Sequence, residues 1–298
     1  PKIRTMEIIR ELEKEPRGVY CGAIGYSGPQ EAVFNVPIRT VVLQGGQGEM
    51  GIGSGIVFDS DPSAEWAECL LKAQFVTGAG RDFQLIETLL WRPGSGYWLL
   101  AEHLQRLTDS AAYFFFPCFR EKIGAALNEA AGSWNAPMRV RLLLDRDGGM
   151  TVSATPCDVR PVMDPDQAPA REPLPEVVFS EYPTDRADRY LLHKTTQRSL
   201  YQAERDHALA RGFYEVLFAN REGEATEGSI TTLFVRQGKQ LLTPPVDCGL
   251  LPGTFRGLLL AQGRAVERVL RREEVSSAAE VFVGNSVRGL VRVRVSPW

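Results

Sequence analysis

Apolar residues recur along the chain with two different periods, and these periods predict its helices and strands. Near the start, Ile3, Met6, Ile9 and Leu12 recur at the spacing of one helix face. Elsewhere, short runs rich in β-branched residues are bounded by Gly, Pro, Asn or Asp, which is typical of strands. The predicted helices are 1–15, 62–76, 99–116, 195–211 and 253–261. The predicted strands are 17–26, 32–44, a short one within 48–62, 83–91, a hairpin over 138–156, 176–180, 213–219, 230–235, 240–243, 265–270, 280–283 and 288–294.

Local signals support several of these boundaries. Asp61-Pro62 suits the N-cap and first position of the second helix, because Pro needs no hydrogen-bond partner there. Pro37 places its strand at an edge or a bulge. The run Asp147-Gly148-Gly149 predicts the turn of the hairpin.

Length and punctuation predict the domain organisation. The 298 residues correspond to about two domains. A Gly-rich joint, "VTGAGRD", separates two patterns, and a Pro-rich charged stretch divides the second pattern into lobes. A helix that begins at Pro1 predicts a further part upstream. The expected fold is α/β in two lobes over 79–298, preceded by a partial α+β segment over 1–78; the lobes are 79–156 and 176–298, joined by the linker 157–175.

Composition excludes several classes of protein. Hydrophobic residues make up 44%, charged residues 24%, and the net charge is -3, as in folded soluble proteins. The acidic balance does not favour nucleic acid or an anionic membrane as partner. No apolar run is long enough for a bilayer, and no signal peptide is recognisable. The five cysteines are scattered without a CxxC pair, which disfavours zinc and disulfides and predicts a cytoplasmic protein.

The stretch "YLLHKTTQRSLYQAE" contains one lysine, Lys194, whose chemistry depends on its company. Alone, such a lysine is usually a solvated charge at a helix start. Downstream, Glu227 lies in a Gly/Ser/Thr stretch, and Pro252-Gly253 opens a helix at Thr254, whose free N–H groups form a potential phosphate site. A lysine for the aldehyde, a carboxylate for the ring nitrogen and a phosphate cradle are what pyridoxal phosphate needs.

The segments that carry this pattern resemble a known family. From about residue 83 to the end, the chain is similar to the class IV aminotransferases, which are the fold type IV pyridoxal-phosphate enzymes, and most similar to their 4-amino-4-deoxychorismate lyases. The matching segments are "FQLIETLLW", "EHLQRLTDSAAYF", "RVRLLLDRDG", "HKTTQRSLY", "EATEGSITTLF", "LLTPPVDCGLLPGTFR" and "VFVGNSVRGL".

The resemblance assigns roles to individual residues. It makes Lys194 the Schiff-base lysine and Glu227 the partner of the pyridine nitrogen. The other implied cofactor contacts are Arg106 for the phosphate, the backbone of Thr254 and Phe255 together with the Ser286 hydroxyl for the phosphate, and Leu251 against the ring. The contact at Phe255 is expected to be main-chain only. Without a cofactor, Arg106 would be a surface helix residue and Ser286 a strand-end serine. His103 is expected to pack on its helix, and His193 has no assigned role.

The front of the chain resembles a second family. The segments "PKIRTMEIIRELE", "RGVYCGAIGY", "NVPIRT" and "GSGIVFDSDPSAEWAECLLKA" are similar to the C-terminal end of chorismate-binding enzymes, which include aminodeoxychorismate synthase and anthranilate synthase component I. Glu65, Glu68 and Lys72 share one helix face. Taken alone, this pattern is a solvated Glu–Lys pair. The resemblance instead implies a Mg²⁺ ligand at Glu68, a chorismate site at Tyr20, Arg39 and Lys72, and carboxylate contacts at the amides of 53–55.

The two resemblances together imply a function. A synthase that makes aminodeoxychorismate, fused to an enzyme that consumes it, indicates a lyase that yields 4-aminobenzoate and pyruvate for folate biosynthesis. Arg139, Arg141 or Arg288 is the candidate for the substrate carboxylates, and the sequence does not choose among them. The alternatives are a branched-chain or D-amino-acid transaminase and a non-catalytic remnant. The implied partners are a second copy in a homodimer and, for the full-length synthase, a glutamine amidotransferase subunit.

Overall fold

The structure is a computed structural model that describes residues 2–77, 83–168 and 172–297. The chain forms two compact units, residues 1–82 and 83–298. Within the described residues, no helix has both the length and the apolar character that crossing a membrane requires.

The front unit contains two helices and two separate hairpins. Its apolar side chains are largely exposed, and helix α1 buries none of its residues. The unit therefore covers little of its own apolar surface. In chain order its elements are α1 (Lys2–Leu12), β1 (Ile24–Ser27), β2 (Ala32–Asn35), β3 (Val41–Gln44), β4 (Gln47–Met50) and α2 (Pro62–Thr77).

Several strands predicted for this unit are shorter than expected. The strand predicted over 17–26 is limited to β1, because Cys21 has a left-handed φ of 58° and a turn precedes it. The strand predicted over 32–44 is two strands, β2 and β3. Pro37, which lacks an N–H, lies between them, and Arg39 has a φ of 52°. No strand forms over 51–57.

Helix α2 begins where the sequence predicts. The Oδ1 atom of Asp61 accepts a hydrogen bond of 2.8 Å from the N–H of Ala64, so it caps the helix, and Pro62 is its first residue. This prediction is confirmed.

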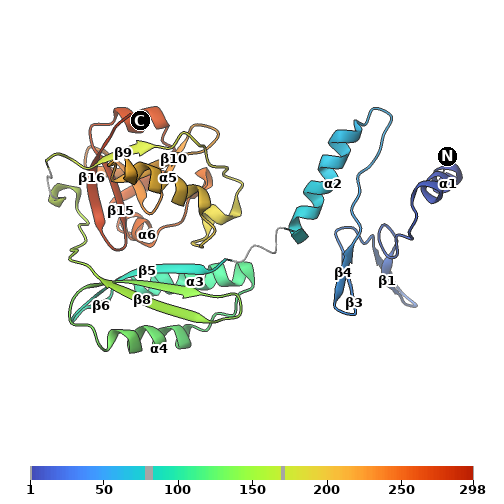
Figure 1. The fold of residues 1–298 in the computed structure, drawn as a ribbon, viewed down its shortest axis with the longest axis horizontal. Helices are drawn as coiled ribbons and strands as arrows, with labels where there is room; N and C mark the ends of the chain where they lie inside the picture. Colours follow the sequence, from blue (N-terminus) through green and yellow to red (C-terminus); the bar gives the residue numbers. More distant parts are fainter. Residues whose placement is uncertain (1, 78–82, 169–171, 298) are drawn as a thin grey trace. The chain divides into compact units, whose positions relative to one another are not determined.

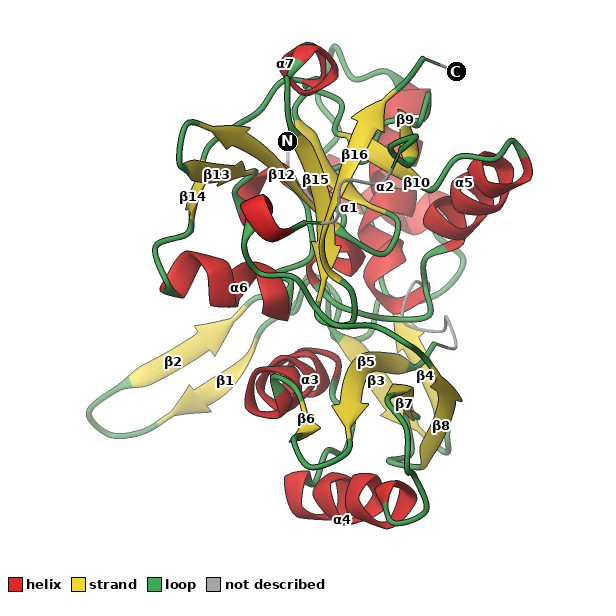
Figure 2. Cartoon of the chain, turned by 90° about the vertical axis from the view of Figure 1, so that its left-hand side faces the viewer, coloured by secondary structure: helices red, strands yellow, loops and turns green. Residues whose placement is uncertain are grey.

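The second unit begins with a small lobe built on an antiparallel sheet in the order β6-β5-β7-β8. Helices α3 and α4 contribute to the same apolar core on one side of this sheet (Figure 2). The predicted hairpin and helix α3 are confirmed, but α4 was not predicted, since only Ile123 and Leu127 of this helix are fully buried. The elements are β5 (Leu85–Arg92), β6 (Gly96–Tyr97), α3 (Leu100–Phe114), α4 (Arg120–Ala131), β7 (Met138–Leu144) and β8 (Met150–Pro156).

Strand β7 shows why the other face of this sheet is polar. Val140, Leu142 and Leu144 are buried in the lobe core, whereas Arg139 and Arg141 alternate with them and are exposed. Neighbouring strands continue the polar face, because Arg141 is paired with Thr88 on β5 and with Ser153 on β8. The sheet thus presents one apolar and one cationic, hydroxyl-bearing face.

The large lobe is built on a mixed sheet of order β11-β10-β9-β16-β15-β12-β13-β14, with a further pairing between β11 and β12. Figure 1 labels strands β9, β10, β15 and β16 of this sheet and the helices α5 and α6 of the same lobe. Parallel pairs such as β9–β10 and antiparallel pairs such as β15–β16 occur in it. The predicted α/β fold in two lobes is confirmed. The elements are β9 (Glu176–Phe179), α5 (Ser199–Ala210), β10 (Glu215–Ala219), β11 (Ala225–Gly228), β12 (Thr232–Gln237), β13 (Gln240–Thr243), α6 (Thr254–Ala261), β14 (Ala265–Glu267), α7 (Arg272–Ser277), β15 (Val281–Asn285) and β16 (Gly289–Val295).

Two boundaries in the large lobe differ from prediction by three residues or more. The helix predicted from residue 195 begins at Ser199, because Thr195 forms a bridge with Leu85 of β5. The strand predicted over 265–270 ends at Glu267. Strand β11 and helix α7 were not predicted. Strand β11 has the sequence Ala-Thr-Glu-Gly, which lacks the run of large apolar residues typical of a strand, and α7, at six residues, is too short to show a helical period.

The first part of the predicted linker packs on the large lobe. The carbonyl of Val162 accepts a hydrogen bond of 2.7 Å from the N–H of Leu290, and Asp166 forms an ion pair of 2.6 Å with Arg236. The linker and lobe boundaries stay predictions.

Candidate active site

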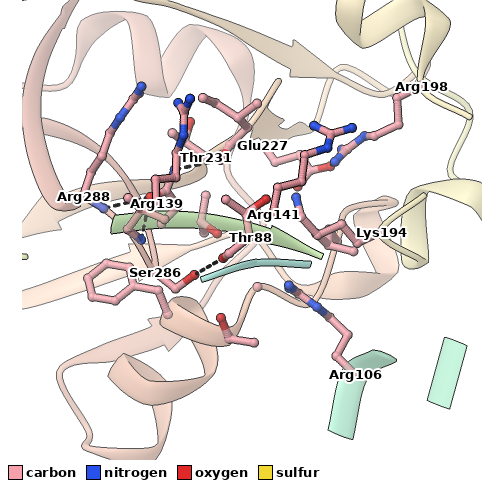
Figure 3. A pocket seen from close by; sticks show the side chains of 18 of the residues that line it. Thr88, Arg106, Arg139, Arg141, Lys194, Arg198, Glu227, Thr231, Ser286 and Arg288 are labelled. Carbon is pink, nitrogen blue, oxygen red and sulfur yellow. Dashed lines mark hydrogen bonds and ion pairs between the residues drawn. The ribbon is translucent and has the colours of Figure 1, made fainter. Parts of the chain in front are cut away.

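A cavity of about 320 Å³ lies within the second unit and brings together residues from both lobes (Figure 3). Six of its lining side chains are cationic and one is a carboxylate. Such a lining favours an anionic ligand with more than one negative group. The lining residues are Thr88, Arg106, Arg139, Arg141, Ser153, Ala154, Thr155, Lys194, Arg198, Glu227, Ile230, Thr231, Thr232, Leu251, Gly253, Thr254, Phe255, Asn285, Ser286, Val287 and Arg288.

Lys194 is held on extended backbone beside strand β5. Its carbonyl accepts a hydrogen bond of 2.9 Å from Ile86, and Thr196 donates one of 2.9 Å to the carbonyl of Gln84. Thr195 between them is fully buried. Successive side chains of extended backbone point to opposite sides, so these contacts direct the Lys194 side chain into the cavity (Figure 3).

The amine of Lys194 is tuned toward its neutral form. Burial, followed by the positive charges of Arg198 and Arg106, lowers the pKa of Lys194 to about 7, and the nearby carboxylates of Glu87 and Glu227 only partly oppose this shift. A substantial share of the amine is therefore unprotonated at neutral pH. A neutral amine is the form that attacks an aldehyde or accepts a proton from carbon.

Glu227 is the single carboxylate of the cavity lining. It lies within strand β11 and is paired with Thr232 of the next strand, β12. Its Oε1 atom lies 3.0 Å from the guanidinium of Arg198, which also stacks on the ring of Tyr201 at 4.4 Å. Burial raises the pKa of Glu227, and Arg198 opposes that shift by stabilising the carboxylate.

Arg106 extends from helix α3 to the cavity and is held by a buried carboxylate. Its Nε and Nη2 atoms donate hydrogen bonds of 2.9 and 2.6 Å to Glu87, and its Nη1 atom donates one of 3.3 Å to the carbonyl of Pro252. Burial alone would raise the pKa of Glu87, but Arg106 and His103 together lower it to about 2. The guanidinium is thus fixed in orientation, with the remaining N–H groups of Nη1 and Nη2 available to a ligand.

His103 does more than pack on its helix, which corrects that prediction. Its Nδ1 atom lies 2.6 Å from Glu87 and its Nε2 atom 3.3 Å from the hydroxyl of Thr254. His193, in contrast, contacts Ser110 on α3 at 3.0 Å and packs on the ring of Tyr113.

The first turn of helix α6 contributes backbone N–H groups to the cavity. Gly253 precedes the helix with extended backbone, and a Cβ there would lie 2.9 Å from the hydroxyl of Thr232. The N–H groups of Thr254 and Phe255 have no partner one turn earlier in the helix, so they can receive an anion. The ring of Phe255 packs in the core against Trp98 and Phe234, which leaves only its main chain to a ligand.

Two further predicted contacts line the same cavity. Ser286 follows strand β15, and its hydroxyl donates a hydrogen bond of 3.5 Å to the carbonyl of Thr88 (Figure 3). The backbone of Leu251 forms a hydrogen bond with the carboxylate of Glu227. The side chain of Leu251, which is 7% exposed, adds an apolar surface to the lining. The structure therefore brings all the residues predicted for the cofactor into one cavity: Lys194, Glu227, Arg106, Leu251, Thr254, Phe255 and Ser286.

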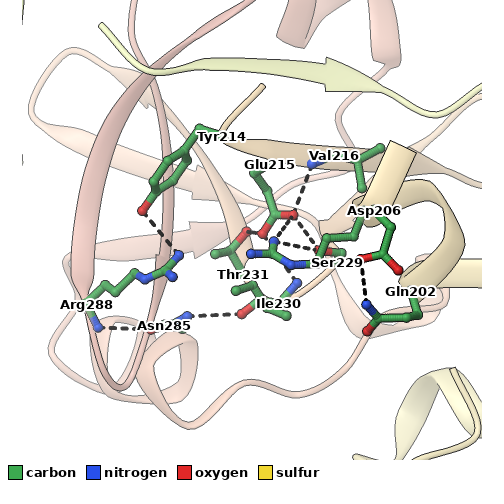
Figure 4. Close-up of polar contacts among 11 residues, drawn as sticks. Gln202, Asp206, Tyr214, Glu215, Val216, Ser229, Ile230, Thr231, Asn285 and Arg288 are labelled. Carbon is green, nitrogen blue, oxygen red and sulfur yellow. Dashed lines mark hydrogen bonds and ion pairs between the residues drawn. The ribbon is translucent and has the colours of Figure 1, made fainter. Parts of the chain in front are cut away.

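Three arginines line the rest of the cavity. The side chains of Arg139 and Arg141 form no ion pair with the carboxylates of the described residues. Arg288 donates a hydrogen bond of 3.3 Å to the hydroxyl of Tyr214 and lies over its ring (Figure 4). These cations are available to a substrate carboxylate.

A buried carboxylate, missed in the sequence, supports one wall. Glu215 accepts hydrogen bonds from Ser229, Thr231 and Arg205 at 2.5, 3.0 and 3.1 Å (Figure 4). It thereby holds the turn between β11 and β12, which carries the lining residues Ile230 and Thr231. The sequence signal was weak, since Glu215 lies in a strand of otherwise apolar residues. Arg198 and Glu87 were missed because their roles depend on partners far away in the chain.

The predicted chorismate residues of the front unit are only partly brought together. Lys72 forms an ion pair of 2.5 Å with Glu68 and donates a hydrogen bond of 3.0 Å to the carbonyl of Gly53. The ring of Tyr20 lies against Gly51 and its hydroxyl lies beside Gly53, but no contact joins Arg39 to these residues within the described chain. In the described residues, no three His, Cys, Asp or Glu side chains gather as a metal site. The Mg²⁺ and chorismate roles stay predictions.

Comparisons with known proteins find separate matches for the front unit and the second unit. Residues 1–78 match the model of the chorismate binding enzymes. Over 74 residues, 24% of this chain, the front is 53% identical to an aminodeoxychorismate synthase of Streptomyces griseus; over 82 residues, 27% of this chain, it is 49% identical to an anthranilate synthase component 1 of Streptomyces coelicolor. The chain spans only 10% and 16% of the length of these two relatives.

The second unit is similar to solved structures. A protein of Mesorhizobium loti, provisionally named an amino-acid aminotransferase, is 38% identical, with a TM-score of 0.65 over 72% of this chain and 100% of its own. A protein of Legionella pneumophila, provisionally named a 4-amino-4-deoxychorismate lyase, shares the fold at 20% identity, with a TM-score of 0.58 over 71% of this chain and 82% of its own. A hypothetical aminotransferase of Mycobacterium tuberculosis in a PLP-bound form shares it at 24% identity, with a TM-score of 0.57 over 75% and 84%.

The model of amino-transferase class IV matches residues 84–295, which is more than half of the chain and contains every side chain that lines the cavity. The match, the two-lobed fold and the lysine–carboxylate–arginine lining lead to one conclusion. The chain belongs to the class IV aminotransferase family.

Proposed function

We propose that the second unit is a pyridoxal-phosphate-dependent lyase that converts 4-amino-4-deoxychorismate into 4-aminobenzoate and pyruvate. The observation that carries the proposal is the lining of one cavity by a lysine amine, one carboxylate and five arginines. Lys194, Glu227 and the free N–H groups at the start of α6 suit the cofactor. Arg139, Arg141 and Arg288, which line the rest of the cavity, suit a substrate with two carboxylates.

The residues that would hold the cofactor fit it in chemistry. Lys194 would bind its aldehyde, Glu227 its ring nitrogen, and Arg106 with the first turn of α6 and Ser286 its phosphate. Leu251 would pack on the ring. When bound, pyridoxal phosphate supplies an electron sink for the bond broken next to the substrate nitrogen. Glu227 favours the protonated ring nitrogen that this sink requires.

Lys194 is the proposed proton carrier of the reaction. Its neutral amine takes the proton from the ring carbon that bears the substrate nitrogen. The C–O bond to the enolpyruvyl group then breaks with its electron pair, and the ring becomes aromatic. The same proton, delivered to the methylene carbon of the leaving group, completes pyruvate, so the step consumes no water and no oxidant. Because aromatisation drives the step, the protein mainly orients the substrate and holds the proton.

The front of the chain favours the lyase over a transaminase. Residues 1–78 resemble synthases that supply a chorismate-derived amine, and such a product would be the substrate of the second unit. The similarity to a provisionally named aminotransferase favours the rival, a transaminase of branched-chain or D-amino acids. A transaminase for apolar side chains would make little use of three further cavity arginines, since desolvating cations without partners is costly.

One assay separates these possibilities. The purified protein with pyridoxal phosphate is incubated with 4-amino-4-deoxychorismate and no 2-oxo acid, and both products are measured. Equal amounts of 4-aminobenzoate and pyruvate support the lyase. Transfer of an amino group from leucine or D-alanine to an added 2-oxo acid, without 4-aminobenzoate, supports the transaminase. A protein that takes up no cofactor supports the non-catalytic remnant.

The roles of the longer protein and its assembly are proposals that rest on the front match. A complete chorismate-binding domain would supply the further carboxylate that Glu68 needs to hold Mg²⁺. Its ammonia would come from a glutamine amidotransferase subunit. We expect the second unit to form a homodimer, which sedimentation velocity would test.

A further inference from the structure

The proposed phosphate cradle is built from two lobes, and its parts must keep a fixed spacing. Arg106 is on helix α3 of the small lobe, whereas Thr254 and Phe255 begin helix α6 of the large lobe. Two polar contacts between α3 and the start of α6 cross the boundary. They are the bond from Arg106 to the carbonyl of Pro252 and the bond between His103 and Thr254, each 3.3 Å long.

The second of these contacts continues into a buried chain of polar groups. Thr254 bonds His103, His103 bonds Glu87 at 2.6 Å, and Glu87 holds Arg106 through two hydrogen bonds. The side chains of His103 and Glu87 are each 1% exposed. The hydroxyl at the start of α6 is therefore connected, through two buried groups, to the guanidinium that faces the same ligand.

We propose that Thr254, His103 and Glu87 form a latch that holds the α6 N-terminus at a fixed distance from Arg106 and so sets the affinity for the phosphate of the cofactor. These three are positioning residues, which act through Arg106 and the α6 backbone. The inference rests on the proposed cofactor and adds the part of the chain that shapes its phosphate site.

The hydrogen bonds of His103 explain why the first residue of α6 carries a hydroxyl. Glu87 is a carboxylate and only accepts, so the Nδ1 atom of His103 donates to it. The second ring nitrogen, Nε2, has the Thr254 hydroxyl as its partner, and a hydroxyl can either donate to this nitrogen or accept from it. A valine at this position would keep the shape but leave a buried nitrogen without a partner, which loosens the latch.

The test must separate a latch from an ordinary core contact. Loss of a core contact would weaken binding of the cofactor and of pyridoxal, which lacks the phosphate, to the same degree. Loss of the latch changes only the phosphate part. The ratio of the two dissociation constants, measured by absorbance titration of the cofactor-free protein, is therefore the decisive quantity.

The variants are Thr254→Val, Thr254→Ser as rescue, and Thr243→Val as a matched control. Thr243 is fully buried, and its hydroxyl bonds the carbonyl of Leu233 away from the cavity. We expect Thr254→Val to raise the dissociation constant of pyridoxal phosphate about fivefold and to leave that of pyridoxal unchanged. Thr254→Ser and Thr243→Val should keep the wild-type ratio. An unchanged ratio in Thr254→Val overturns the latch.

Stabilisation of the protein by inorganic phosphate tests the latch independently of pyridoxal phosphate. Inorganic phosphate should raise the melting temperature of the cofactor-free protein, and less so for Thr254→Val. If the wild type binds phosphate but no pyridoxal phosphate, the proposed function fails and the phosphate series alone decides on the latch. If Thr254→Val does not fold, Thr254→Ala takes its place. Equal phosphate stabilisation of wild type and variant rejects the latch.

Discussion

The guanidinium of Arg198 lies 3.0 Å from the carboxylate of Glu227, and both groups line the cavity that contains the amine of Lys194. The positive charge of Arg198 lowers the pKa of both Glu227 and Lys194. Arg198 stabilises the charged form of Glu227, and its positive charge disfavours the ammonium form of Lys194. One arginine thus favours both the anionic partner and the neutral amine that the proposed chemistry requires.

Lys194→Ala should abolish formation of 4-aminobenzoate, because no other amine of the described chain lines the cavity. We expect a loss of at least about 10³-fold in turnover. After borohydride reduction, the cofactor should be found on the Lys194 peptide of the wild type and on no peptide of the variant. Lys239→Ala, which changes an exposed lysine in a hairpin turn, is the control. Near wild-type product formation by Lys194→Ala contradicts the proposal.

Capture of the cofactor should follow the lowered pKa of Lys194. Because that pKa is about 7 and not 10.5, the neutral fraction increases through pH 7 and is nearly complete above pH ~8. The rate of cofactor uptake by the cofactor-free protein, recorded by stopped-flow absorbance, should increase from pH 6 and then level off. Arg198→Gln removes a cation and should move the midpoint to higher pH, whereas Arg221→Gln, on the exposed surface, should not. A rate that still climbs tenfold per pH unit beyond pH ~9 would contradict this prediction.

The same shift predicts that the lysine destabilises the folded chain. The folded pKa lies below the unfolded one, so the unfolded state binds more protons between pH 7 and 10.5, and stability increases with pH across this window. Lys194→Met should therefore raise the free energy of unfolding at pH 7 by about 1–2 kcal/mol. The gain should shrink toward pH 10.5. Urea denaturation of the cofactor-free protein at pH 7 and 9.5 measures it, and a gain that is equal at both values argues against an electrostatic cause.

Glu227→Gln should separate binding from catalysis. The cofactor can still be held by Lys194 and its phosphate, but its ring nitrogen loses the carboxylate that favours protonation. We expect turnover to fall about 10²–10³-fold with the cofactor still bound. Glu222→Gln, on the surface, is the matched control. If both variants retain wild-type turnover, Glu227 is not the partner of the ring nitrogen.

Arg141→Gln tests the binding of a substrate carboxylate. Arg141 lines the cavity on the polar face of strand β7, paired with Thr88 and Ser153 and with no ion-pair partner among the described residues. Loss of one charge-assisted contact should raise KM for 4-amino-4-deoxychorismate about 10–100-fold, with cofactor affinity unchanged. Arg146→Gln, an exposed arginine beyond the same strand, is the control. An unchanged KM would assign the carboxylates to Arg139 or Arg288.

The sequence by itself pointed to Lys194, Glu227 and the start of helix α6, because each lies in a short stretch with its own local signal. Arg106, Leu251 and Ser286 followed from the resemblance of their segments to a known family, and the cofactor roles of all these residues stay predictions. The Gly before Thr254, the hydroxyls around Glu227 and the helix of Arg106 are each recognisable without a fold. Hydrophobic periodicity predicted most helices and strands, the Asp-Gly-Gly turn predicted the hairpin over 138–156, and the Pro-rich stretch predicted two lobes. These features depend on residues that are near one another in the chain.

Only the tertiary structure decided which side chains act on one another. Glu87 and Arg106 are 19 residues apart, His103 and Thr254 are 151 apart, and Arg198 and Glu227 are 29 apart. Thr195 belongs to the edge of β5, 110 residues away, and not to a helix, because pairing with another strand overrides local preference. A pKa depends on burial and on the charges that folding brings near. The lowered pKa of Lys194 therefore depends on both lobes, since Arg106 comes from the small lobe and Arg198 from the large lobe.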